Sequence, residues 1–300
     1  MRTRSPALVL AAALILAGCG GSGRGGADDG RLAVVATTTQ LADFTRAVGG
    51  DRVRVTGILK PNVDAHDFEP SPADIDAIAR AGVLVTNGLG LEEWLDDTIT
   101  ASGFEGTRVE AATGITPLGD EGTDPHVWQD VANAKVMVAN IGRALAAADP
   151  AGAATYDANQ RAYTAELDAL DAEIEREVAT IPAADRKLVT NHEAFNYYAR
   201  AYHLEVVGSV IPSFDTSAEL SVREVAELVD KIRATGVKAV FSEASLPPQT
   251  AETIGREAGV KVVAGEDALY GDSLGPDGSD AATYLAMMRH NTRVIVASLR

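Results

Sequence analysis

The sequence predicts an α/β protein of two pseudo-symmetric lobes, each a parallel sheet flanked by helices, bridged by one long rigid helix. Short runs rich in β-branched residues alternate with longer amphipathic runs in both halves of the chain. Such alternation predicts parallel strands with helices on both faces. Between the halves, residues 151 to 179 form a single uninterrupted helical pattern. A folded body of about 270 residues is also long enough for two lobes.

The first lobe, residues 31 to 148, alternates four predicted strands with four predicted helices. Its second helix is expected to begin after Ser71, because serine caps helix N-termini and Pro72 suits a first turn. We expect strands at 32–37, 53–59 and 83–86, a short fourth strand beginning at Val109, and helices at 41–48, 72–81, 91–101 and 132–147.

The linking helix is assigned to residues 149 to 182. Its apolar residues recur at helical spacing, and residues 153 to 179 contain neither glycine nor proline, so the helix is expected to bend only gently. At 1.5 Å per residue the uninterrupted stretch from 153 to 179 is roughly 40 Å long. Pro182 is expected to end it.

The second lobe, residues 183 to 300, repeats the plan of the first. Short strand-like runs again alternate with amphipathic helical runs, so a second parallel sheet is predicted. We expect strands at 187–190, 205–210, 238–241 and 261–263, and helices at 194–203, 218–235, 249–258 and 280–298.

The N-terminal segment is typical of a secretory signal. Arg2 and Arg4 precede an apolar run, and Leu16-Ala17-Gly18-Cys19 resembles a lipobox, the processing site of bacterial lipoproteins. Residues 1–18 are therefore expected to be removed, leaving Cys19 lipidated at the start of a flexible tether over residues 19–30. The alternative is a simple signal peptide with a cysteine near its cleavage site. The lipobox interpretation is favoured because Cys19 is the only cysteine.

The composition excludes some classes of partner. The formal net charge of −17 argues against nucleic acid as a partner. No later segment is long and apolar enough for a predicted transmembrane helix, so the lipid anchor is the expected attachment to the membrane. We expect a monomer.

Four potential metal ligands follow predicted strands. His66 lies in the loop after strand 53–59, His126 lies in the loop TDPHVWQD, and His192 directly follows strand 187–190. Asp272 lies in a glycine-flanked loop after the last strand. Ligands of open α/β sheets bind at the carboxyl ends of strands, and three imidazoles with one carboxylate make a tetrahedral set for a divalent transition metal.

The spacing alone leaves another interpretation open. No HExxH and no paired CxxC motif is present. Each histidine could be an ordinary loop residue with a backbone hydrogen bond. The two remaining histidines are expected to be structural or on the surface: His203 near the C-terminal end of a helix, where the helix dipole favours an imidazole, and His290 inside the last helix.

Four segments carry a resemblance to the zinc- and manganese-type solute-binding lipoproteins of bacterial metal ABC importers. The similarity runs in order over most of residues 32 to 299. It implies two lobes on a stiff helix, a metal buried between them, ligands His66, His126, His192 and Asp272, and a membrane permease as partner. The segments are PNVDAHDFEPSPADI, TDPHVWQDVANA, VTNHEAFNYYARAYHL and YGDSLGPDGSDAATYLAMMRHN.

The resemblance implies an extracytoplasmic binding subunit that captures Zn(II) and delivers it to the permease. Histidine at 192, where the family has histidine or glutamate, favours zinc over manganese. Mn(II) remains open, because residues 119 to 125 lack the histidine-rich loop of many zinc-specific members. Four protein ligands leave no position for an activated water, so no enzyme is expected. The alternatives are a Mn(II)-specific subunit, a secreted zinc hydrolase with Glu193 as base, and an adhesin-like protein with a structural metal.

Residues around the ligands are also predicted. Carboxylates should orient the imidazoles, and Glu243, at the end of a strand, is the first candidate, ahead of Asp67 and Glu193. A surface charge is the alternative for Glu243. Pro125 is expected to fix the backbone before His126, with Trp128 beneath the loop. The glycines beside Asp272 predict that its loop is the most mobile part of the site.

Overall fold

The computed structural model describes residues 30–119, 123–216 and 221–300. The predicted signal peptide, Cys19 and the tether up to residue 29 lie outside the described residues. Residues 31 to 300 form one compact unit. Within the described ranges, no helix combines the length and the apolar character needed to cross a bilayer.

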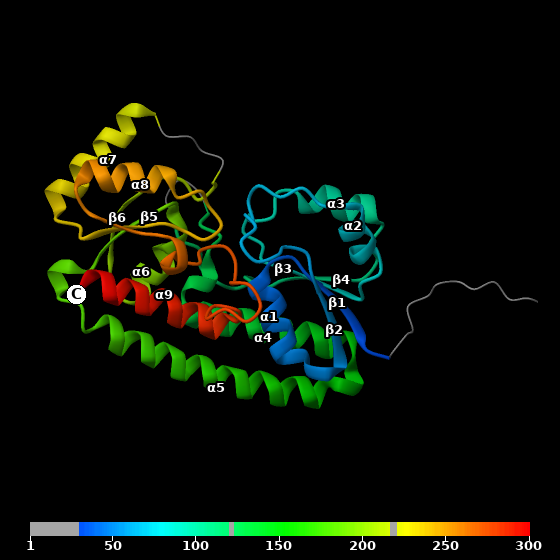
Figure 1. The fold of residues 1–300 in the computed structure, drawn as a ribbon. Helices are drawn as coiled ribbons and strands as arrows, with labels where there is room; N and C mark the ends of the chain where they lie inside the picture. Colours follow the sequence, from blue (N-terminus) through cyan, green and yellow to red (C-terminus); the bar gives the residue numbers. More distant parts are fainter. Residues whose placement is uncertain (1–29, 120–122, 217–220) are drawn as a thin grey trace, which may run out of the picture. The chain divides into compact units, whose positions relative to one another are not determined.

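The first lobe contains a four-stranded parallel sheet (Figure 1). Its strands are β1 (Leu32–Ala36), β2 (Val53–Gly57), β3 (Val83–Thr86) and β4 (Thr107–Glu110), in the order β2-β1-β3-β4. Val34 of β1 lies opposite both Val55 and Val83. The two central strands are adjacent to each other, so their carboxyl ends lie side by side at one edge of the sheet.

Helices cover both faces of this sheet because successive strand residues point to opposite sides. Val34 packs into the core shared with α1 (Thr39–Gly49) and α4 (Val131–Ala148). Val35 packs into a separate cluster with α2 (Pro72–Ala79) and α3 (Leu95–Ser102). Continuous apolar runs therefore suit these strands, since both of their faces are buried.

The helix starts of the first lobe follow the capping residues. Ser71 caps α2 in a capping box with Asp74, and the helix begins at Pro72 as the sequence predicts. The start expected at residue 91 is wrong, because α3 begins at Leu95. The backbone before it turns around the carboxylate of Glu92, which accepts hydrogen bonds from the N–H groups of Asn87 and Gly88.

The linking helix α5 runs from Ala153 to Val178, 26 residues, after a short 3-10 turn at Pro150–Gly152. It packs against α1 and α4 at one end and against α9 (Tyr284–Leu299) of the second lobe at the other (Figure 1). One stripe of its surface faces these helices, so a single uninterrupted helix supports both lobes. The buried residues of the stripe are Tyr156, Tyr163, Leu167, Leu170, Ile174 and Val178.

The second lobe repeats the strand order of the first. Strand β5 (Lys187–Thr190) pairs in parallel with β6 (Glu205–Ser209), and β7 (Ala239–Phe241) pairs in parallel with β8 (Lys261–Val263). These are two separate two-stranded ladders, with β5 beside β7. The resulting order β6-β5-β7-β8 matches β2-β1-β3-β4, which is the predicted pseudo-symmetry.

Helices again cover both faces. Val189 packs with α7 (Val222–Thr235) and α8 (Gln249–Ala258), whereas Leu188 packs into the large core with α6 (Asn196–Ala201) and α9. Helix α9 begins at Tyr284, four residues later than the start expected at 280. Thr283 precedes it, and the hydroxyl of Thr283 accepts a hydrogen bond from the N–H of Ala286. Helix α6 is shorter than predicted because residues 193–195 form a 3-10 turn.

Candidate metal centre

The four side chains singled out at strand ends converge on one point. One ligand atom from each of His66, His126, His192 and Asp272 lies within 4.8 Å of those of all the others. His66 comes from the loop after β2 and His126 from the segment between β4 and α4, while His192 follows β5 and Asp272 lies between β8 and α9. The side chains of His126, His192 and Asp272 are fully buried, and that of His66 is 7% exposed. The lobes thus contribute two residues each.

Five of the six separations between the donor atoms are close to those of a tetrahedral metal shell. Nε2 of His126 lies 3.2 Å from Nε2 of His66 and 3.3 Å from Nε2 of His192. Carboxylate oxygens of Asp272 lie 3.3 Å from Nε2 of both His126 and His192, and 3.7 Å from that of His66. Four donors at about 2.0–2.1 Å from a tetrahedral zinc ion are about 3.3–3.4 Å apart. The pocket therefore has the dimensions of a metal coordination shell.

Two carboxylates set the tautomers of two imidazoles in the same way. Oδ1 of Asp124 accepts hydrogen bonds from the backbone N–H of His126 (3.0 Å) and from its Nδ1 (2.8 Å). Oε1 of Glu243 accepts the corresponding pair from His192, both at 3.0 Å. A proton held on Nδ1 leaves the Nε2 lone pair free. Both lone pairs then point at the common centre.

Asp272 lacks partners other than the imidazoles. Both of its buried carboxylate oxygens receive no hydrogen bond among the described residues. Burial favours the neutral acid, yet the charge of His192 and the interactions with both buried histidines hold the pKa of Asp272 well below its usual range. A buried carboxylate facing three imidazole nitrogens requires a positive charge, which either protons or a divalent cation can supply.

The imidazole pKa values reflect the same competition. Burial opposes protonation of His126, but the hydrogen bond with Asp124 and the nearby carboxylate of Asp272 outweigh it and raise the pKa of His126. Burial also opposes protonation of His192, but the charges of Glu243 and Asp272 raise its pKa well above the usual value. At His66 burial prevails and lowers the pKa. The three imidazoles therefore differ in how strongly each holds a proton, and His66 holds it least.

Of the three predicted orienting carboxylates, only Glu243 lies against an imidazole. Asp67 is exposed, and Glu193 is partly buried; in the described part of the chain neither side chain has a hydrogen bond to an imidazole. Asp124 was missed. The sequence does contain a local indication of this role: Asp124 lies two residues before His126, and an aspartate at that spacing can accept a hydrogen bond from the backbone N–H of the histidine.

We expect Asp124→Ala and Glu243→Ala each to weaken metal binding by about 10–100-fold, the usual effect of removing a residue that orients a metal ligand. Asp67→Ala is the matched control, because it removes a nearby carboxylate that contacts no imidazole. Isothermal titration with Zn(II) measures all three. Equal losses in Asp67→Ala and Asp124→Ala would show that net charge, not orientation, is responsible.

The other two histidines lie outside this centre. His203 is exposed and follows α6 in a left-handed conformation with φ of 59°. His290 is buried in α9, where Nε2 lies 3.0 Å from the carbonyl of Ala268 and Nδ1 lies 3.2 Å from Asp280. These positions agree with the structural roles expected for them.

A second buried carboxylate that the sequence analysis missed lies behind the His126 loop. Glu92 accepts hydrogen bonds from the hydroxyl of Thr37 (2.5 Å) and from the N–H groups of Asn87 (2.6 Å) and Gly88 (3.1 Å). Burial nevertheless raises its pKa. The amide of Asn87 in turn donates to the carbonyl of Pro125 at 3.0 Å. Glu92 thus anchors the loop after β3 to the backbone next to His126.

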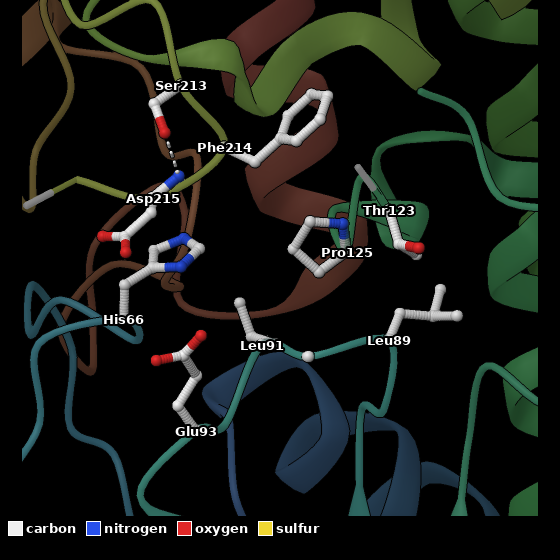
Figure 2. Close-up of a pocket in the computed structure, with 10 residues that line it drawn as sticks. His66, Leu89, Leu91, Glu93, Thr123, Pro125, Ser213, Phe214 and Asp215 are labelled. Atoms are coloured by element: carbon white, nitrogen blue, oxygen red, sulfur yellow. Dashed lines mark hydrogen bonds between the residues drawn. The ribbon is translucent and has the colours of Figure 1, made fainter. Parts of the chain in front are cut away.

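A cavity of about 480 Å³ opens onto the centre, and of the four converging residues only His66 lines it. Figure 2 shows its ring with the carboxylate of Asp215 beside it and that of Glu93 on the loop below. Leu89, Leu91 and Pro125 line the same cavity (Figure 2). The His66 side is therefore the accessible side of the centre.

The chain is similar to proteins that are named for metal uptake or metal binding. The family model described as zinc-uptake complex component A, periplasmic, matches residues 34–298. The manganese-binding lipoprotein MntA of Halalkalibacterium halodurans is 35% identical over 97% of each chain, and that of Bacillus subtilis is 34% identical over the full length of both. The periplasmic zinc-binding protein TroA of Treponema pallidum has a similar structure, with a TM-score of 0.84, 30% identity, and coverage of 90% of this chain and 99% of that one.

Proposed function

This chain belongs to the zinc-uptake complex component A family, and from that premise we propose that it is the extracytoplasmic metal-binding subunit of an ABC importer. One observation supports this most directly: three imidazole nitrogens and an otherwise unpartnered carboxylate converge within 4.8 Å in a buried site. His66, His126, His192 and Asp272 are the proposed ligands. The first lobe (31–148) and the second (183–300) would enclose the ion, and the membrane permease would receive it.

The cargo is a divalent transition metal, either Zn(II) or Mn(II). The three histidine donors favour Zn(II). The two MntA relatives are named for manganese. Both oxygens of Asp272 are available, and added oxygen ligation suits manganese. We therefore treat Mn(II) as at least as well supported as the Zn(II) that the sequence alone favoured.

The donor set supports binding rather than catalysis. Three protein ligands and a water are the arrangement of a catalytic zinc site, whereas this chain offers four protein ligands. The hydrolase alternative relied on Glu193 as base, and in the described structure the side chain of Glu193 has no hydrogen bond to the converging residues. No observation favours that alternative.

The proposal is tested by the metal that the protein carries. Protein purified from cells without added metal is expected to contain about one equivalent of zinc or manganese by elemental analysis, and competition titration then ranks the two ions. Loss of the gene should lower cellular uptake of the same ion. Purified protein that binds neither ion would overturn the proposal.

We propose further that Cys19 carries the lipid anchor, in keeping with the lipoprotein names of the relatives. Cys19→Ser is expected to move the protein from the membrane fraction to the soluble fraction. Its metal affinity should stay unchanged, because the ligands all lie beyond residue 31. Fractionation of cells expressing each form, followed by titration, checks both points. Wild-type protein in the soluble fraction would contradict the anchor.

A further inference from the structure

The carbonyl of Gly271, one residue before Asp272, is held by two side chains of the other lobe. Nε1 of Trp128 donates to it at 3.0 Å and Nε2 of Gln129 at 2.9 Å. Both donors are buried, and together they use both lone pairs of the carbonyl oxygen. They belong to the 3-10 turn Val127–Gln129, which immediately follows His126. The turn thus directly follows one proposed ligand and holds the backbone beside another.

The neighbouring residues of the Asp272 segment are held by the first lobe too. The sequence predicted a mobile, glycine-flanked loop, but residues 271 to 274 make hydrogen bonds to the other lobe at three positions. Besides the Gly271 carbonyl, two more groups of the segment are bonded. The hydroxyl of Ser273 accepts a hydrogen bond from the N–H of Asn62 (3.0 Å), and the N–H of Leu274 donates to the hydroxyl of Thr39 (2.8 Å).

Gly271 itself serves close packing. A Cβ built on it would lie 2.1 Å from Oε2 of Glu243, the carboxylate that orients His192. Its φ is not in the left-handed region, so the backbone conformation does not require glycine. The residue is small because Glu243 passes directly over it, and this contact leaves the backbone little room to move toward the second lobe.

We propose that Trp128 and Gln129 are positioning residues for Asp272, and that their hold on the Gly271 carbonyl sets how long the metal stays bound. This inference rests on the proposed function. Rotation of the peptide at Gly271 would swing the carboxylate of Asp272 away from the imidazoles. A carboxylate already in place loses little conformational freedom on binding the ion. Once the hold is removed, the effect should appear mainly in the dissociation rate.

Gln129→Leu tests the inference with little change in volume. Zn(II) is loaded and its release is followed by capture with an excess of chelator. One lost buried hydrogen bond predicts release about fivefold faster, within the range of such bonds. Trp128→Phe, which removes the other donor but keeps an aromatic ring, should act in the same direction. Asn140→Leu is the matched control, because the buried amide of Asn140 donates to the carbonyls of Ala111 and Thr113, which are not in the Asp272 segment. It should leave the release rate unchanged.

A double-mutant comparison separates positioning from general loosening. If Gln129 acts through Asp272, Gln129→Leu should have no further effect on zinc release in an Asp272→Asn background. The same acceleration in both backgrounds would overturn the inference. If Asp272→Asn binds zinc too weakly for its release rate to be measured, amide hydrogen exchange of residues 271–274 in metal-free protein replaces that measurement. The inference predicts faster exchange in Gln129→Leu than in the wild type, and unchanged exchange would refute the inference. Asp272→Asn that releases zinc at the wild-type rate would instead contradict the proposed ligand set.

Discussion

Replacing His126 or His192 with alanine is expected to weaken Zn(II) binding by on the order of a hundredfold or more. This loss is larger than the one expected from removing Asp124 or Glu243, the carboxylates that orient these histidines. Each change removes one of four donors. Each also leaves a buried carboxylate, Asp124 or Glu243, without the imidazole that it binds. His66→Ala should likewise weaken binding strongly, although no carboxylate is orphaned. Competition titration against a chelator of known affinity measures these losses.

The two remaining histidines supply the controls. His203→Ala changes an exposed side chain and should alter neither affinity nor stability. His290→Ala removes buried hydrogen bonds in α9, so it should lower the free energy of unfolding by about 1–3 kcal/mol while affinity stays unchanged. If His203→Ala weakened zinc binding as much as His126→Ala, the proposed ligand set would be wrong.

Metal affinity is expected to fall steeply as the pH is lowered, beginning above the ordinary imidazole pKa of about 6.5. Imidazoles bind metal only when neutral, so protons compete with the ion. The pKa values of His126 and His192 are raised in the metal-free protein, which shifts this competition upward in pH. Because the pKa of His66 is lowered, protonation of His66 competes least with metal binding. With two protons displaced, affinity changes about a hundredfold per pH unit within that range.

The stability of the metal-free protein should show the opposite dependence. A histidine whose pKa is raised by folding contributes stability that is complete below its unfolded pKa and is lost as the pH rises through its folded pKa. Metal-free protein should therefore lose the contributions of His126 and His192 toward alkaline pH, where added Zn(II) should raise the melting temperature most. Melting curves from pH 5 to 9, with and without zinc, test this. If the metal affinity itself, measured by titration, were the same from pH 5 to 9, histidines would be excluded as the main ligands.

Much of the fold was readable from local patterns. Apolar runs of strand length and helical periodicity gave both lobes and the linking helix, because burial on both faces of a parallel strand leaves a local signature. Ser71 and Pro72 located the start of α2, because a capping residue binds backbone groups within the next few residues. The start of α3 was misplaced because Glu92 is fixed by a distant contact: its carboxylate accepts a hydrogen bond from Thr37, 55 residues away, as well as from the preceding backbone.

The sequence by itself determined which residue types stand at the strand ends: three histidines and an aspartate, in loops that parallel strands bring to one edge of each sheet. Only the tertiary structure decided which of the three candidate carboxylates holds an imidazole, Glu243 and not Asp67 or Glu193, and that Asp272 is held from the opposite lobe. Glu243 lies 51 residues from His192, and Gly271 lies 142 residues from Gln129. Such contacts leave no periodic signal, because they depend on how two lobes pack and not on the spacing of residues along either one.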